Sequence, residues 1–201
     1  MAEYADTISP ERLVDLALSA KERGNIGIAF TYNEPLVGYE FLRDTAKLSK
    51  EQGLKNVIVT SGTADLSVWE ELKPYIDALN IDLKGFTDRY YDEVLCGNRS
   101  QVMEFITETV KTAHVELTTL IVPGENDSID EMRELSEWVS RIKEPDGEDV
   151  PLHITRFFPR FHMIDREPTD PALLHRLADV AGENLKYVYL GNMPVSARQN
   201  P

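Results

Sequence analysis

The sequence predicts an α/β protein, a partial (βα) barrel of about six parallel strands. Strand-like and helix-like segments alternate along the whole chain, which is typical of a parallel sheet with right-handed crossovers. Most strand-like runs are almost continuously apolar, as expected for parallel strands covered on both faces. Six strands are too few for a closed eight-stranded barrel. We therefore expect an open barrel, with a doubly wound sheet as the alternative.

Capping residues predict where the helices begin and end, and runs of β-branched residues predict the strands. Ser9 followed by Pro10 predicts a first helix that Gly24 ends, and Ser128 with Glu131 has the spacing of a capping box. The further helices are expected over 36–51, 66–76, 88–95, 100–112, 128–142 and 170–181. The strands are expected over 26–32, 56–60, 78–84, 115–122, 152–158 and 185–190. No linker interrupts this order, which predicts one domain over 1–201.

Composition excludes several classes of protein. The net charge of -14 disfavours nucleic-acid binding, because phosphate contacts require a basic surface. No apolar run reaches the ~20 residues of a membrane-spanning helix, and no secretory signal is visible, so we expect a cytoplasmic protein without a membrane partner. The single cysteine, Cys96, excludes an internal disulfide and a multi-cysteine zinc site. No metal ligands are predicted.

Polar side chains follow or end five of the predicted strands. An α/β barrel builds its site at the carboxyl ends of its strands. With alternation along each strand, the residues expected to face one hollow are Glu34, Thr60, Asp82, Lys84, Glu116, Thr118 and Arg156. Such a set suits a small molecule with an amine for Glu34 and a carboxylate for Lys84 or Arg156. Thr60 and Ser61 could bond a ribose hydroxyl.

Structural roles remain open for the same residues. Glu34 before Pro35 could cap the next helix, Asp82 and Lys84 could simply pair with each other, and Arg156 could make an ordinary ion pair. His153 has the opposite parity to Arg156 and is expected to be a packed histidine. His162, in a loop after the fifth strand, is the one histidine considered functional.

The chain resembles the radical S-adenosylmethionine superfamily, and more closely its pyruvate formate-lyase-activating enzyme branch and the related AmmeMemoRadiSam-system enzymes. The similarity runs from about Ser9 to Pro194. The motifs that carry it are Tyr32-Asn33-Glu34-Pro35, Val59-Thr60-Ser61-Gly62, Asn80-Ile81-Asp82-Leu83-Lys84, Val94-Leu95-Cys96-Gly97, Thr118 through Ser128, Arg156-Phe157-Phe158-Pro159 and Tyr187 through Asn192.

The resemblance implies that the chain binds S-adenosylmethionine. It implies cofactor-binding roles for Asn33, Glu34, Thr60, Ser61, Asp82, Lys84, Thr118 and Arg156. Glu34 would meet the amino group, Thr60 and Ser61 the ribose, and Asp82 and Lys84 the methionyl part.

The departures from the family concern its [4Fe–4S] cluster. The family holds the cluster on a Cys-x3-Cys-x2-Cys loop on the first barrel strand, ahead of the region matching Ser9. This sequence has no such loop, and Cys96 cannot replace three thiolates. Phe158 stands where close relatives carry a histidine. Because the first strand is also missing, we expect strand 26–32 to be a sheet edge open to a partner chain or to self-association.

Three functions follow from these observations. The first is an incomplete radical enzyme, in which the family reaction of cleaving S-adenosylmethionine to a 5′-deoxyadenosyl radical would need cluster ligands from elsewhere. Whether this chain is an enzyme by itself stays open. The second is a cluster-free nucleoside-binding or scaffold module. The third is a sugar-phosphate barrel enzyme using Asp82 and Lys84, with a phosphate site near Gly191-Asn192.

Overall fold

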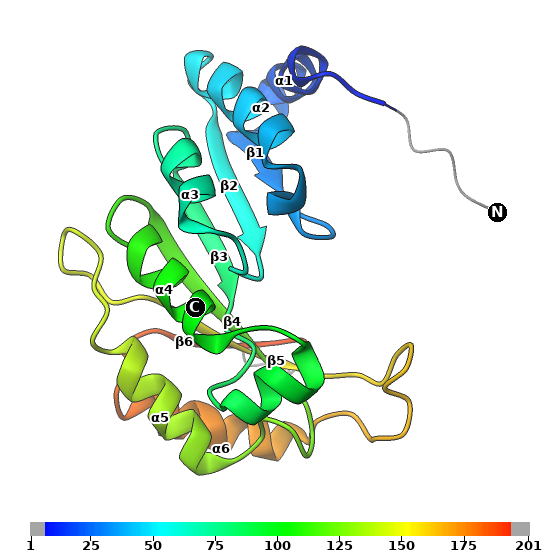
Figure 1. The fold of residues 1–201 in the computed structure, drawn as a ribbon, viewed down its shortest axis with the longest axis vertical. Coiled ribbons are helices and arrows are strands. Elements are labelled where there is room, and N and C mark those ends of the chain that lie inside the picture. The colour runs from blue at the N-terminus through cyan, green and yellow to red at the C-terminus, as the bar shows by residue number, and fades with distance from the viewer. Residues whose placement is uncertain (1–6, 194–201) are drawn as a thin grey trace.

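A computed structural model describes residues 7–193, which form one curved parallel sheet with helices packed on its outer side (Figure 1). The strands follow chain order, each hydrogen-bonded to the next. They are β1 (Gly27–Phe30), β2 (Lys55–Thr60), β3 (Ala78–Asp82), β4 (His114–Ile121), β5 (Leu152–Arg156) and β6 (Val188–Gly191). Parallel neighbours in unbroken order, joined by right-handed crossovers, place all connections on the same face.

This topology confirms the partial barrel and rules out the doubly wound alternative, in which the strand order reverses. In the described residues β1 pairs with β2 alone and β6 with β5 alone, so the sheet is open at both edges. The predicted six strands are all present, each within a few residues of its expected bounds.

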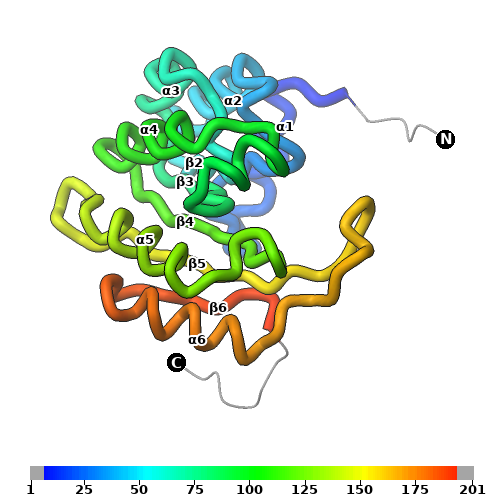
Figure 2. The backbone as a smooth tube through the Cα atoms, turned by 60° about the horizontal axis from the view of Figure 1, so that its bottom comes forward, coloured from blue at the N-terminus to red at the C-terminus, as the bar shows by residue number. Residues whose placement is uncertain are grey.

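Helices cover the convex face of the sheet (Figures 1 and 2). They are α1 (Pro10–Ser19), α2 (Tyr39–Glu51), α3 (Leu66–Leu72), α4 (Arg99–Thr109), α5 (Ile129–Val139) and α6 (Pro171–Gly182). Short 3₁₀ turns follow α1 at Lys21–Arg23 and precede α2 at Pro35–Gly38, and Tyr90–Leu95 forms a π-helical turn where an α-helix was expected. Ser9, Asp65, Asn98, Ser128 and Asp170 cap their helices through side-chain oxygens.

The core lies between the sheet and the helices. Alternate strand residues such as Ile58, Ile81, Leu117 and Ile154 are fully buried against the helices. The intervening residues are half-buried or exposed, so the expectation of strands covered on both faces is wrong for these residues. One face of this sheet lines the hollow of the arc, where side chains remain accessible to a ligand.

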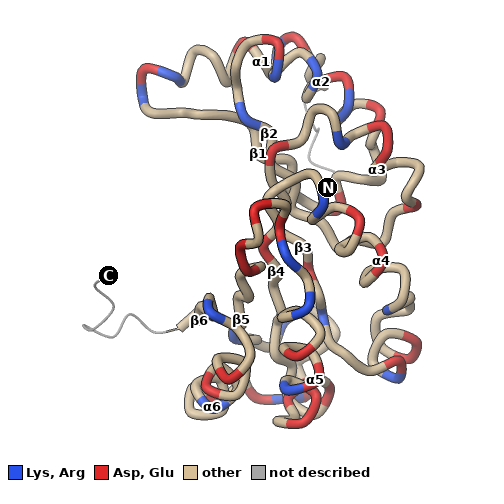
Figure 3. The backbone as a smooth tube through the Cα atoms, turned by 90° about the vertical axis from the view of Figure 1, so that its left-hand side faces the viewer, with Lys and Arg blue, Asp and Glu red and all other residues tan. Residues whose placement is uncertain are grey.

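Two surface features complete the fold. The segment between β5 and α6 projects from the body in both views (Figures 1 and 2). Its side chains of Phe158, Phe161 and Ile164 are exposed. Acidic and basic residues are interspersed over the helices and loops (Figure 3). Within residues 7–193, no helix combines the length and the apolar stretch needed to cross a bilayer.

Candidate functional site

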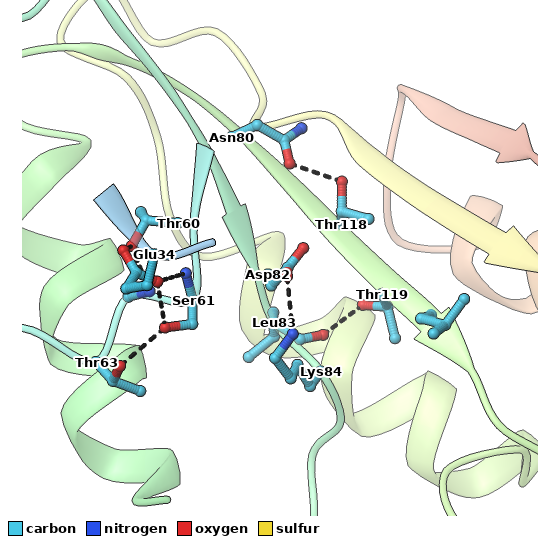
Figure 4. A network of polar contacts seen from close by, with 12 residues as sticks. Glu34, Thr60, Ser61, Thr63, Asn80, Asp82, Leu83, Lys84, Thr118 and Thr119 are labelled. Carbon is cyan, nitrogen blue, oxygen red and sulfur yellow. Dashed lines mark hydrogen bonds and ion pairs between the residues drawn. The ribbon is translucent and has the colours of Figure 1, made fainter. Parts of the chain in front are cut away.

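A cavity of about 590 Å³ lies at the carboxyl ends of β1, β2 and β3. Its lining residues are Thr31, Tyr32, Asn33, Glu34, Val59, Thr60, Ser61, Asp82 and Lys84. Six of the eight sequence-predicted binding residues are among them. In Figure 4, Glu34, Thr60 and Ser61 gather on one side, with Asp82 and Lys84 across from them. The volume lies within the range of small-molecule sites.

Glu34 is fixed by four hydrogen bonds. Its Oε1 accepts from Thr60 Oγ1 at 2.6 Å and from the Leu36 amide at 3.2 Å. Its Oε2 accepts from the Ser61 amide and Ser61 Oγ, both at 2.7 Å. A carboxylate has about four acceptor positions, so Glu34 uses all of them inside the protein. The expected capping role is therefore real: Glu34 caps the 3₁₀ turn that begins at Pro35 and also ties it to the end of β2.

The hydrogen bonds keep Glu34 ionised. Partial burial opposes ionisation, but the donors on Thr60, Ser61 and Leu36 outweigh it and hold the pKa of Glu34 below its ordinary value. Its negative charge therefore faces the cavity at neutral pH.

Asp82 and Lys84 form the second charged group of the cavity. Lys84 Nζ lies 2.8 Å from Asp82 Oδ2, and both side chains are about one-third exposed. The pairing weighed as a structural alternative is thus present. Because the pair is accessible to solvent, Lys84 can still turn its remaining N–H groups towards a ligand anion.

Thr118 faces the hollow of the sheet but does not line this cavity. It lies opposite Asp82 in the strand register, and its hydroxyl donates to Asn80 Oδ1 at 2.8 Å. Figure 4 shows this pair apart from Glu34.

Arg156 does not point into the hollow, contrary to the predicted parity. Its register partner is the buried Ile121, and its Nε donates to the Thr169 carbonyl at 2.7 Å. The guanidinium lies 4.8 Å from the centre of the Phe158 ring. Alternation along β5 puts Arg156 on the same face as Leu152 and Ile154. That face packs against the helices, whereas the sequence prediction assigns it to the hollow.

The opposite parity brings His153 into the hollow, where it contacts Glu116. His153 Nε2 lies 2.8 Å from Glu116 Oε2, and its ring stacks on Tyr189 at 5.3 Å. Burial opposes ionisation of Glu116, but the bonds from His153 and His114 hold its pKa below the ordinary value. Glu116 lies nearer the amino end of β4 than Thr118 does and is absent from the cavity lining.

His162 is exposed on the projecting segment, and its ring lies tilted against that of Phe161. It does not line the cavity. Gly191 and Asn192 do not line it either, and Asn192 Nδ2 donates to the Arg156 carbonyl at 3.3 Å. The sugar-phosphate alternative therefore loses its phosphate site beside Asp82 and Lys84.

The sequence missed three lining residues, Thr31, Tyr32 and Val59. The sequence could have indicated these three residues only by their position, since each lies within two residues of a predicted site residue at the end of a strand. A second cavity of about 320 Å³ shares Ser61 and Lys84 with the first and extends past Tyr91 and Gln101. The hollow at these strand ends is therefore larger than the predicted set implied.

The residues of this chain do not fit a [4Fe–4S] cluster. Three thiolates are needed, and the sequence contains one cysteine. Cys96 is exposed at the end of the π-helical turn. Between residues 7 and 193, no group of three His, Cys, Asp or Glu side chains is arranged to hold a metal ion.

The sequence is similar to those of several known proteins. The model of the Radical SAM superfamily matches residues 1–139. An uncharacterized protein of Methanocaldococcus jannaschii is 37% identical over 200 residues, covering 96% of this chain and 56% of that protein. The pyruvate formate-lyase-activating enzyme of Clostridium pasteurianum is 29% identical over 135 residues, 66% of this chain and 56% of the enzyme. The chain thus spans about half the length of these relatives.

Solved structures share the fold. A domain of a pyruvate-formate lyase-activating enzyme from Bacteroides vulgatus superposes with a TM-score of 0.69 at 16% identity, covering 83% of this chain and 99% of that one. Streptococcus suis SuiB bound to S-adenosylmethionine gives a TM-score of 0.69 at 12% identity, over 95% of this chain and 43% of SuiB. The family match, over more than half of the sequence, and the six-stranded open sheet agree. This chain belongs to the radical SAM superfamily.

Proposed function

We propose that this chain is the S-adenosylmethionine-binding part of a radical enzyme related to the pyruvate formate-lyase-activating enzymes. The observation that carries the proposal is the pair of opposite charges in one cavity. Glu34 presents a fixed negative charge, and Lys84 presents a positive charge across from it. A free amino acid group carries the complementary ammonium and carboxylate.

The proposed roles follow from this arrangement. Glu34 attracts the ligand's ammonium through its charge, and an ammonium N–H shares an oxygen that already accepts from Thr60 or Ser61. Lys84 binds the carboxylate. The hydroxyls of Thr60 and Ser61 donate to Glu34 and can still accept from a ribose hydroxyl. Asn33 completes the rim, while Thr118 and Arg156 are left out because neither lines the cavity.

The experiment is calorimetry of this chain with S-adenosylmethionine. We expect binding that Glu34→Ala abolishes. Glu116→Ala is the matched control, since it removes a carboxylate from the same sheet that does not line the cavity, and binding should persist. Equal affinity in wild type and Glu34→Ala, or no binding by a folded wild-type chain, would overturn the proposal and favour a scaffold.

We further propose that the chain by itself binds S-adenosylmethionine without cleaving it. In such enzymes the iron–sulfur cluster supplies the electron for cleavage, and a single cysteine does not hold one. Iron and sulfide analysis after anaerobic reconstitution is the test. We expect no stoichiometric cluster on this chain alone, and finding one would contradict the proposal.

A second polypeptide segment that carries the cluster cysteines is the proposed partner of β1. Within the described residues β1 pairs with β2 alone, which leaves one edge of parallel backbone groups open. Ile26, just before β1, and Tyr32, two residues after it, are 76% and 94% exposed. Mixing the chain with a peptide that contains a Cys-x3-Cys-x2-Cys loop should give a complex by analytical ultracentrifugation, weakened by Ile26→Lys. Concentration-dependent dimers of the chain alone would instead indicate self-association.

A further inference from the structure

The segment Leu83–Phe86 leaves β3 directly after Asp82 and carries Lys84 into the cavity. Its position sets the point from which the Lys84 side chain enters the cavity, while the ion pair with Asp82 holds the ammonium at the other end. The segment is buried at Leu83, Gly85 and Phe86. Its backbone polar groups therefore need partners inside the protein.

Side chains from β4 and the turn after it supply two of these partners. Thr119 Oγ1 donates to the Leu83 carbonyl at 2.7 Å. Asn126 Nδ2 donates to the Lys84 carbonyl at 2.6 Å and to the Leu120 carbonyl at 2.8 Å, while its Oδ1 accepts from the Val122 amide at 2.7 Å. Both side chains are buried, so these bonds have little competition from water.

Helical residues supply three further partners. Glu131, at the start of α5, reaches out and accepts from the Phe86 amide at 2.7 Å. Tyr91 Oη accepts from the Lys84 amide at 3.2 Å, and Arg99 donates to the Phe86 carbonyl at 2.5 Å. A Cβ on Gly85 would lie 2.7 Å from Tyr90 Cδ1 and 3.1 Å from Glu131 Oε1, so only glycine fits here. The segment is held from three sides.

Both backbone polar groups of Lys84 are thereby fixed, one by Tyr91 and the other by Asn126. Lys84 Nζ then lies 2.8 Å from Asp82 Oδ2, on the cavity side. By contrast, Arg156 on β5 shares none of these supports. A site group held within a fraction of an ångström needs such a supporting layer.

We infer that Thr119, Asn126 and Glu131 are positioning residues that fix Lys84 for its ligand. The inference rests on the proposed function for the identity of that ligand. None of the three lines the cavity, so each acts through the backbone of segment 83–86.

Matched variants of Thr119 and Glu131 test the inference by calorimetry with S-adenosylmethionine. Thr119→Val keeps the shape and removes the donor to Leu83, whereas Thr119→Ser keeps the hydroxyl. Glu131→Ala removes the acceptor for Phe86, whereas Glu131→Gln keeps its Oε1. We expect affinity to fall about tenfold, one hydrogen bond's worth, in Thr119→Val and Glu131→Ala. Thr119→Ser and Glu131→Gln should stay within about twofold of wild type.

A stability control separates positioning from general damage. Leu177→Ala opens a cavity in α6, which packs on α5, β5 and β6. It should lower the melting temperature without changing affinity. A loss of affinity in Leu177→Ala equal to that in Thr119→Val would overturn the inference.

Two readouts need no bound ligand and keep the inference separate from the proposed function. Hydrogen exchange at the Phe86 amide should quicken in Glu131→Ala and not in Glu131→Gln. The ¹³C resonance of reductively methylated Lys84 should shift in Thr119→Val and not in Thr119→Ser. If wild type binds no S-adenosylmethionine, the proposed function fails while these readouts still decide the positioning. If both readouts are unchanged by the variants, the positioning role is wrong even where the ligand binds.

Discussion

The polar residues at the strand ends have different surroundings in the two halves of the sheet. At β1, β2 and β3, polar residues from separate strands meet around one cavity, with Glu34 bonded to the end of β2 and Lys84 facing it. At β4 and β5, the corresponding residues lie outside the cavity, with Thr118 bonded to Asn80 and Arg156 to the segment before α6.

The difference shows that a polar residue at the end of a strand does not necessarily line the site. Whether it does depends on which face of the sheet its side chain is on and on the path of the loop that follows. Arg156 and His153 illustrate this. They lie on opposite faces of β5, so Arg156 faces the helices and His153 faces the hollow.

Replacing the two basic residues gives the largest expected contrast between the halves. Lys84→Met should weaken S-adenosylmethionine binding by ~10–100-fold, the value of a charge-assisted hydrogen bond. Arg156→Met should change it by less than about twofold. Calorimetry measures both. A larger loss in Arg156→Met would mean that β5 also contributes to the site.

Replacing Thr169 tests whether the polar groups next to β5 stabilise the fold. Its buried hydroxyl donates to the Ile121 carbonyl at 2.6 Å and accepts from the Phe157 amide at 3.0 Å. Thr169→Val leaves both groups without a partner, so the free energy of unfolding should fall by about 1–3 kcal/mol. Urea denaturation measures this, and ligand affinity should stay within about twofold. Unchanged stability would show that the hydrogen bonds beside Arg156 do not stabilise the fold.

The pH dependence of Glu34 gives a smaller effect. Its pKa is lower in the folded protein than the ordinary 4.5, so it stabilises the fold above that value. This contribution is lost as pH falls through the folded pKa. The stability difference between wild type and Glu34→Gln should therefore be constant at neutral pH and shrink below about pH 4.5. A difference that grows on acidification would contradict the charged hydrogen-bond network.

The Thr118–Asn80 pair should give the smallest effect. Thr118→Val removes one half-exposed hydrogen bond, which contributes about 0.5–1.5 kcal/mol to stability. Ligand affinity should not change, because the pair lies outside the cavity. A tenfold loss of affinity, measured by calorimetry, would extend the site to β4 and erase the contrast between the two halves.

Much of this protein was readable from its sequence. Alternating apolar runs and capping residues determined the six strands, the order of the helices and, through Tyr32 to Pro35 and Asp82 to Lys84, the family. These signals are local, since backbone propensity, side-chain caps and burial periodicity act over a few neighbouring residues.

Only the tertiary structure decided which polar groups meet. Glu34 uses all its acceptor positions on Thr60, Ser61 and Leu36, and Asn126 and Glu131 hold a segment some 40 residues earlier in the chain. Spacing along the chain does not encode such contacts, because they depend on strand register, on the turn after each strand and on which buried backbone groups still lack a partner.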